Sequence, residues 1–169
     1  MYELAKHKKS LESQKKIYKG LREILKTKPL NEVTVTDIKN QCHISRSTFY
    51  RNFNNVIDVL DVMLEFFYNR YLESRIGKEN QLLYFFEYWQ YHKDLINIIS
   101  SQNQNLIKNC MKRHEKDIKE NPYLFDVKYS ILTSILCEWS NSKKGTPLEL
   151  MKITHDFLNL KCIDLLIDL

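Results

Sequence analysis

The side chains best suited to chemistry lie in one short stretch, residues 45–53, with the sequence SRSTFYRNF. Phe49 and Phe53 are four residues apart, so on a helix they share one face and can be buried together. The remaining positions of that helix carry guanidinium, hydroxyl and amide groups: Arg46, Ser47, Thr48, Tyr50, Arg51 and Asn52. Groups of this kind hydrogen-bond phosphate oxygens and base edges in DNA. The pattern predicts a short helix with one face against the protein and a polar, cationic face for nucleic acid.

A second short helix is predicted just before it, over Val35–Gln41. Thr34 is the expected N-cap of this helix, and Asp37 stands where it can complete a capping box. Ser45 is the expected N-cap of the following helix, Arg46–Asn52. Two short helices joined by a turn of a few residues describe a helix-turn-helix, whose second helix lies in the major groove of DNA.

The stretch from Ile17 to Leu64 resembles the N-terminal DNA-binding domain of the TetR family of bacterial transcriptional regulators. The resemblance is carried by Thr-Val-Thr-Asp-Ile at 34–38, by Ile-Ser-Arg-Ser-Thr-Phe-Tyr at 44–50 with Phe53, and by the capped helix that follows. It implies base contacts by the start of the second helix and backbone contacts by its neighbours. The expected DNA-binding residues are Thr36, Ser45, Arg46, Ser47, Thr48, Tyr50, Arg51 and Asn52. Chemically, Arg46 is the strongest candidate for a bidentate contact with guanine.

Three positions depart from the family pattern. His43 stands where the turn usually has Gly, and we expect a positive φ there, which His tolerates better than a β-branched residue does. Lys39 replaces a small residue between the two helices, so its side chain must extend outward. Val56 replaces a Lys that usually contacts a phosphate at the start of the next helix.

The charge is unevenly distributed along the 169 residues. Residues 1–53 hold 12 Lys or Arg against 5 Asp or Glu, whereas residues 54–169 hold 14 against 16. A basic N-terminal third beside a near-neutral remainder is typical of a nucleic-acid module joined to another domain. A solvated, Lys-rich surface is the alternative interpretation of the charge taken alone. We predict a DNA-binding domain over 1–55 and a regulatory and dimerisation domain over 56–169.

The composition and the apolar periodicity favour an all-α fold. The chain has only 3 Gly and 3 Pro, and its apolar residues recur at helical spacing. About nine helices are expected, over Leu11–Lys28, Val35–Gln41, Arg46–Asn52, Val56–Arg75, Gln81–His92, Asp94–Ser101, Leu106–Lys119, Leu124–Asn141 and Pro147–Ile167.

The second half of the chain is rich in aromatic side chains. A cluster this dense is either core or the lining of a ligand pocket, since pockets are mostly apolar and aromatic. The candidate ligand-binding residues are Phe67, Tyr71, Phe86, Trp89 and Tyr129.

The last two predicted helices have more apolar surface than one partner helix needs. A two-fold, four-helix interface would bury the excess, and the family resemblance implies the same homodimer. Packing within a monomer is the alternative. The candidate dimerisation residues are Leu132, Leu136, Trp139, Phe157, Leu160 and Ile163.

The remaining patterns exclude several classes. There is no nucleophile paired with a base, no pair of carboxylates in a catalytic context and no phosphate loop, so we expect no enzyme activity and no cofactor. Cys110 and His114 have the spacing of metal ligands, but two residues do not make a site, and we expect no metal. No run of 18 apolar residues and no signal peptide are evident, which favours a cytoplasmic protein without membrane contact.

These expectations combine into one function. The sequence predicts a homodimeric regulator, implied by resemblance to be a repressor, that binds double-stranded DNA at a palindromic operator and is released by a small-molecule effector. The alternative is a regulator or co-activator controlled by a protein partner, with no small effector.

Overall fold

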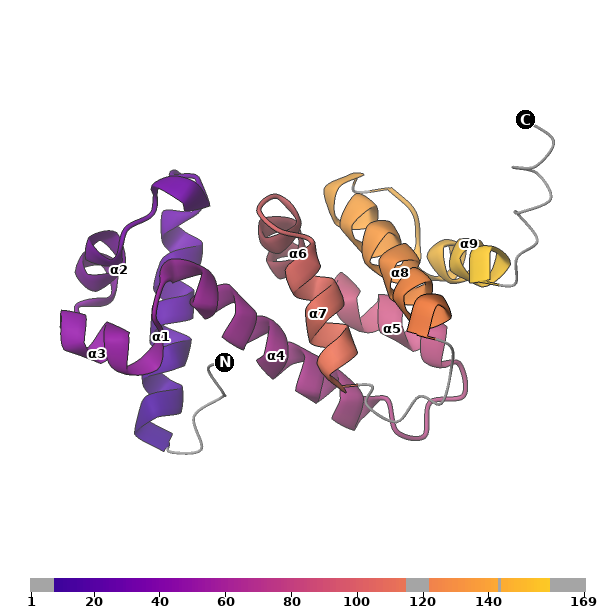
Figure 1. Cartoon of the computed structure of the whole chain (residues 1–169), viewed down its shortest axis with the longest axis horizontal. Helices are drawn as coiled ribbons and strands as arrows, with labels where there is room; N and C mark the ends of the chain where they lie inside the picture. The colour runs from indigo at the N-terminus through magenta and orange to yellow at the C-terminus, as the bar shows by residue number, and fades with distance from the viewer. Residues whose placement is uncertain (1–7, 115–121, 143, 159–169) are drawn as a thin grey trace. The chain divides into compact units, whose positions relative to one another are not determined.

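The computed structural model describes residues 8–114, 122–142 and 144–158, and the regular structure in these ranges is helical. The helices follow in the order shown in Figure 1, and the all-α prediction is confirmed. Their bounds are α1 Lys8–Ile24, the 3-10 turn η1 Leu30–Glu32, α2 Val35–Cys42, α3 Arg46–Asn52, α4 Val56–Ser74, α5 Gln81–Gln90, α6 Lys93–Ser100, α7 Asn105–His114, α8 Pro122–Ser142 and α9 Pro147–Leu158.

The chain forms two compact units, residues 1–67 and residues 68–169. The division falls within α4, later than the boundary after residue 55 that we predicted. The physical reason is that the first part of α4 is tied to α1. The ring of Phe67 lies 6.3 Å from that of Tyr18 in an edge-on contact, and Lys15 lies 5.3 Å from the ring of Phe66.

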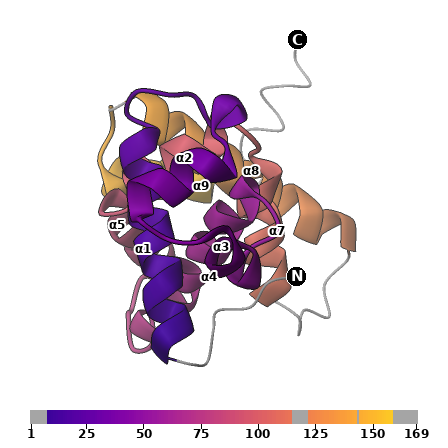
Figure 2. The same cartoon turned by 90° about the vertical axis from the view of Figure 1, so that its left-hand side faces the viewer.

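The first unit is organised around α1, which runs beside α2 and α3 (Figure 2). Ile17 and Leu21 of α1, Ile38 of α2 and Phe49 of α3 are each fully buried. These are the apolar positions at helical spacing, so burial of one stripe from each helix explains why three short amphipathic segments fold together.

Gly20 lets α1 and α2 approach closely. A Cβ added at this position would overlap Cys42 Sγ, and the Cys42 thiol also lies 3.5 Å from the Lys16 carbonyl oxygen. Any side chain at position 20 would therefore push α2 away from α1.

The connection between α1 and α2 contains the short 3-10 turn η1. Pro29 precedes it in extended conformation, and the Val33 N–H donates to the Leu30 carbonyl. Leu30 is buried, so the short turn is anchored by packing as well as by its own hydrogen bond.

In the second unit, α8 packs against α6, α7 and α9, and α5 packs against α9. Phe86 and Trp89 of α5 and Leu136 and Trp139 of α8 are all at most 2% exposed. The ring of Phe86 meets that of Trp139 edge-on at 6.1 Å. These aromatic side chains form the core of the unit.

The turn before α9 is fixed by a capping box. Glu149 accepts from the Thr146 N–H at 2.7 Å, and the Thr146 hydroxyl accepts from the Glu149 N–H at 3.3 Å. Gly145 has φ 86°, which favours glycine, and its carbonyl accepts from Trp139 Nε1 at 3.0 Å. Among the described helices, none is both long enough and apolar enough to cross a membrane.

Candidate functional site

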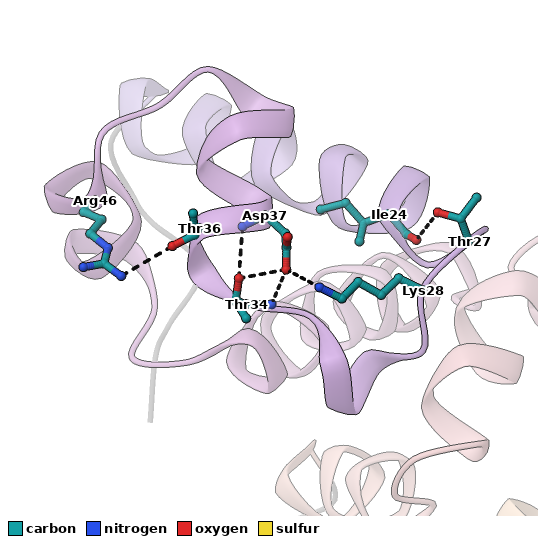
Figure 3. Close-up of polar contacts among 7 residues, drawn as sticks. All are labelled: Ile24, Thr27, Lys28, Thr34, Thr36, Asp37 and Arg46. Carbon is teal, nitrogen blue, oxygen red and sulfur yellow. Dashed lines mark hydrogen bonds and ion pairs between the residues drawn. The ribbon is translucent and has the colours of Figure 1, made fainter.

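The start of α2 is held by three donors that converge on one oxygen of Asp37 (Figure 3). Asp37 Oδ2 accepts from the Thr34 N–H at 2.7 Å, from the Thr34 hydroxyl at 2.8 Å and from Lys28 Nζ at 2.7 Å. The predicted capping box is confirmed. Lys28, then Thr34, lower the pKa of this carboxyl from 3.8 to about 2. The carboxylate is also favoured by the positive end of the helix dipole.

The turn from α2 to α3 has the backbone conformation that we predicted. His43 has φ 48° and ψ 53°, in the left-handed region. Its N–H donates to the Asn40 carbonyl at 3.4 Å, and the Ile44 N–H donates to the Lys39 carbonyl at 3.2 Å. Lys39 is exposed, which agrees with the expected outward course of its side chain.

Hydroxyl groups gather at the N-terminus of α3. Ser45 Oγ accepts from the Thr48 N–H at 3.0 Å, which confirms Ser45 as the N-cap. The same oxygen lies 2.8 Å from Ser47 Oγ and 2.8 Å from Thr48 Oγ1. Backbone N–H groups, hydroxyls and the positive end of the helix dipole together suit a phosphate or a base edge.

Arg46 bridges the two helices of the motif. Its Nη2 donates to the Thr36 hydroxyl at 3.4 Å, so the guanidinium of α3 lies beside the first turn of α2 (Figure 3). This hydrogen bond is long and exposed. Its acceptor is a neutral hydroxyl group and not a carboxylate. The arrangement leaves the side chain able to exchange Thr36 for a base or phosphate.

The structure brings the predicted DNA-binding residues together on one face. Those that are exposed are Thr36, Ser45, Arg46, Ser47, Tyr50 and Arg51, and Thr48 is partly exposed. Opposite them, Phe49 and Phe53 are fully buried, with ring centroids 5.8 Å apart. The alternation between buried rings and exposed polar groups follows the pattern read from the sequence.

Asn52 differs from the other predicted contact residues because it is only 2% exposed. Its Nδ2 donates to the Thr48 carbonyl at 2.7 Å, and its Oδ1 accepts from the Ser10 hydroxyl at 2.7 Å. The side chain therefore links the start of α1 to the end of α3. Its burial and these two hydrogen bonds indicate that Asn52 positions α3, and they leave little of the side chain for the predicted contact with DNA.

The second unit contains a pocket of about 240 Å³. It is lined by Tyr68, Tyr71, Arg75, Gln81, Leu82, Phe85, Met111, Lys128, Tyr129, Leu132 and Leu158. Two of the five predicted ligand-binding residues, Tyr71 and Tyr129, are among them. Phe86 and Trp89 are fully buried in the core, and Phe67 packs on Tyr18 in the first unit. We therefore do not retain these three as ligand contacts.

The predicted dimerisation residues divide into three groups. Leu132, Leu136 and Trp139 are at most 7% exposed within a single chain, so they have little surface left to give to a partner. Phe157 is 43% exposed. Leu160 and Ile163 lie outside the described residues. Further exposed apolar side chains, outside the predicted dimerisation set, are Val127 of α8 and Leu148 and Ile153 of α9.

Some functional side chains gave no signal in the sequence. Lys28 hydrogen-bonds Asp37, nine positions later in the sequence, and Ser10 hydrogen-bonds Asn52, 42 positions later. No helical or strand periodicity links positions at these separations. Arg75 lies in the turn after α4 and Lys128 in α8, so only the tertiary structure brings them to one pocket.

Solved structures with a similar fold include two that are named as TetR regulators. A TetR-family transcriptional regulator from Syntrophomonas wolfei, described as putative, superposes with a TM-score of 0.63 at 18% identity, covering 90% of this chain and 95% of that one. A TetR transcriptional regulator from Streptococcus agalactiae has a TM-score of 0.58 at 17% identity and covers 89% and 95%. The dihydroxyacetone kinase operon activator DhaS has a TM-score of 0.51 at 18% identity and covers 92% and 97%.

The chain therefore has the all-α fold of TetR-family regulators. No family model matches the sequence, and no curated protein matches it either. The likeness extends over both units, because about nine-tenths of the chain is covered in each comparison.

Proposed function

We propose that the protein is a DNA-binding transcriptional regulator that reads its operator through α3. The observation that carries the proposal is the two-faced recognition helix. Phe49 is fully buried, whereas Arg46, Tyr50 and Arg51 are exposed on a helix whose start is fixed by the Ser45 cap. A rigid helix that presents guanidinium and hydroxyl groups is the arrangement that recognises base edges in the major groove.

We propose further that the regulator is a homodimer bound to a palindromic operator. Two copies of α3 would enter successive major grooves, because a two-fold protein matches a two-fold site. Exposed Lys and Arg of the first unit would add affinity that falls with rising salt. The apolar side chains left exposed on α8 and α9 are the surface available for the partner copy.

The proposed regulation is repression that a small ligand in the second unit relieves. The ligand must bind the DNA-competent and DNA-incompetent states with unequal affinity to have this effect. α4 continues from the first unit into the second, which makes it the element that a ligand would act through. DhaS is named an activator, so activation, with a protein partner in place of a small ligand, is the second candidate.

The experiment that tests DNA recognition is selection of bound duplexes from a random pool at moderate salt. We expect an inverted repeat to be enriched. Arg46→Ala should lose about 1–3 kcal/mol of binding free energy and relax the preference at one base position in each half-site. Arg70→Ala, which removes an exposed guanidinium of the second unit, serves as the matched control. It should retain the binding free energy and the base preference of the wild type.

Two results would count against this proposal. If well-folded protein enriches no sequence, α3 does not read DNA specifically. If Arg46→Ala weakens binding equally for every sequence, Arg46 contacts phosphate and the base readout lies elsewhere.

A further inference from the structure

The pocket of the second unit has walls that are largely aromatic and aliphatic. Tyr68, Tyr71, Phe85 and Tyr129 line it, and each is at most 5% exposed. Tyr71 holds Phe85 edge-on at 5.6 Å. Rings packed in this way present flat, rigid surfaces, which favour a planar ligand because stacking loses little conformational freedom.

Among the described residues that line the same pocket, two are cations and none is a carboxylate. The Arg75 guanidinium lies 5.7 Å from the Tyr71 ring, and Lys128 Nζ lies 5.8 Å from the Tyr129 ring. Arg75 comes from the turn after α4 and Lys128 from α8, and each cation lies over a ring of the wall. A ligand with one negative group would find two positive partners beside an apolar surface.

The position of Arg75 is fixed by its backbone. Its N–H donates to the Tyr71 carbonyl at 2.9 Å, and its own carbonyl accepts from the Lys78 N–H at 3.1 Å. Gln81 Nε2 donates to the same carbonyl at 3.0 Å and to the Lys78 carbonyl at 2.7 Å. The side-chain amide of Gln81 therefore closes the turn after α4 and fixes the backbone of Arg75 beside the pocket.

The volume limits the size of the occupant. The pocket measures about 240 Å³, which is larger than the cavity of about 150 Å³ that accepts benzene and smaller than the range of about 300–1,000 Å³ found for drug-sized ligands. One or two fused rings would fill it.

We propose that this pocket binds a small planar anion, an aromatic carboxylate of one or two rings, with its rings against Tyr71 and Tyr129 and its carboxylate beside Arg75 and Lys128. The inference rests on the proposed ligand control of DNA binding for its biological role, and it names the chemical class of that ligand.

The test is equilibrium dialysis of the full chain against three probes that share one naphthalene ring system and differ in charge. These are 2-naphthoate, neutral 2-naphthamide and cationic 2-naphthylmethylammonium. The acid should bind at least about tenfold more tightly than the amide, because a hydrogen bond to a charged group contributes more than a neutral one. The ammonium probe should bind least.

Variants locate the binding site. Arg75→Gln and Lys128→Gln should each reduce naphthoate affinity several-fold and leave naphthamide affinity within about twofold. Arg70→Gln on α4 and Lys152→Gln on α9 remove exposed cations that do not line the pocket, so they should change neither. Thermal unfolding followed by circular dichroism confirms that each variant is folded.

The proposal is overturned if the amide or the ammonium binds as tightly as the acid, if both pocket variants keep naphthoate affinity, or if no probe binds up to about 1 mM. Its failure is distinguishable from that of the proposed function. DNA binding is measured separately on the selected operator, without and with naphthoate. Acid binding that leaves operator affinity unchanged supports the ligand class and rejects ligand control of DNA.

Discussion

The same kind of apolar periodicity predicts burial well in the helix-turn-helix of the first unit and poorly in the last two helices of the second unit. In α3, a helix of seven residues, one apolar pair is buried and nearly every polar residue is exposed. In α8, a helix of 21 residues, the apolar residues chosen for a partner subunit, Leu132, Leu136 and Trp139, are buried within the chain itself.

The difference teaches where periodicity is informative. A short capped helix has room for one buried face, so its polar residues must face solvent or a ligand. A long helix that is apolar around much of its circumference is buried on several sides. Its pattern cannot separate the side that packs within the chain from the side that meets a partner.

The largest expected effect tests whether the aromatic cluster of α5 is core. Phe86→Ala should lower the free energy of unfolding by about 3–5 kcal/mol, because a fully buried ring leaves a cavity. Urea denaturation followed by tryptophan fluorescence measures this. Tyr91→Ala, at a residue 86% exposed at the end of the same helix, should change it by less than about 0.5 kcal/mol. An unchanged unfolding free energy for Phe86→Ala would contradict the core role of Phe86 and leave it a candidate ligand contact.

A smaller effect tests the exposed side of α9. Phe157→Glu should weaken dimerisation by about 2–4 kcal/mol, because it places a charge in the proposed apolar contact. Sedimentation at several protein concentrations measures the shift toward monomer. Ile76→Glu makes the same change at an apolar residue that is 81% exposed outside α8 and α9, and it should keep the dimer. Equal masses for the two variants would remove Phe157 from the interface.

The smallest effect tests the capping of α2. The folded state lowers the pKa of Asp37 from 3.8 to about 2, so the ionised carboxylate stabilises folding above pH 3.8. This stabilisation is lost as the pH falls toward 2. The difference in unfolding free energy between the wild type and Asp37→Asn should therefore shrink over that interval. Urea denaturation at a series of pH values measures it.

Lys28→Gln provides the matching comparison. It removes the strongest of the partners that lower the pKa of Asp37. In the Lys28→Gln background, the effect of Asp37→Asn on the unfolding free energy should therefore depend less on pH. The dependence that remains is due to the hydrogen bonds from Thr34. A difference between wild type and Asp37→Asn that stays constant with pH would reject the assigned role of this carboxyl.

The parts of the fold that could be predicted are those fixed over a few residues. The caps at Thr34, Ser45 and Thr146 each involve a partner three residues later, and the positive φ of His43 follows from the tight turn. These local constraints give the helix starts and the exposed face of α3.

The parts that could not be predicted depend on contacts between distant positions. Asn52 has the chemistry of a DNA contact, but its side chain is buried, and one of its two hydrogen-bond partners, the Ser10 hydroxyl, lies 42 residues earlier. The pocket combines residues of five helices and one turn, so the aromatic pattern alone could not separate Tyr71 and Tyr129, which line it, from Phe86 and Trp89, which do not.

The close approach at Gly20 gives the first unit a reporter of its opening, and the tryptophans give the second unit another. Cys42 lies directly beneath Gly20, and burial raises the pKa of its thiol, so a thiol reagent reaches it only when α1 and α2 separate. Both tryptophans, Trp89 and Trp139, belong to the second unit. The rate at which the Cys42 peptide is alkylated and the change in tryptophan fluorescence therefore measure the unfolding of the two units separately in one unmodified chain.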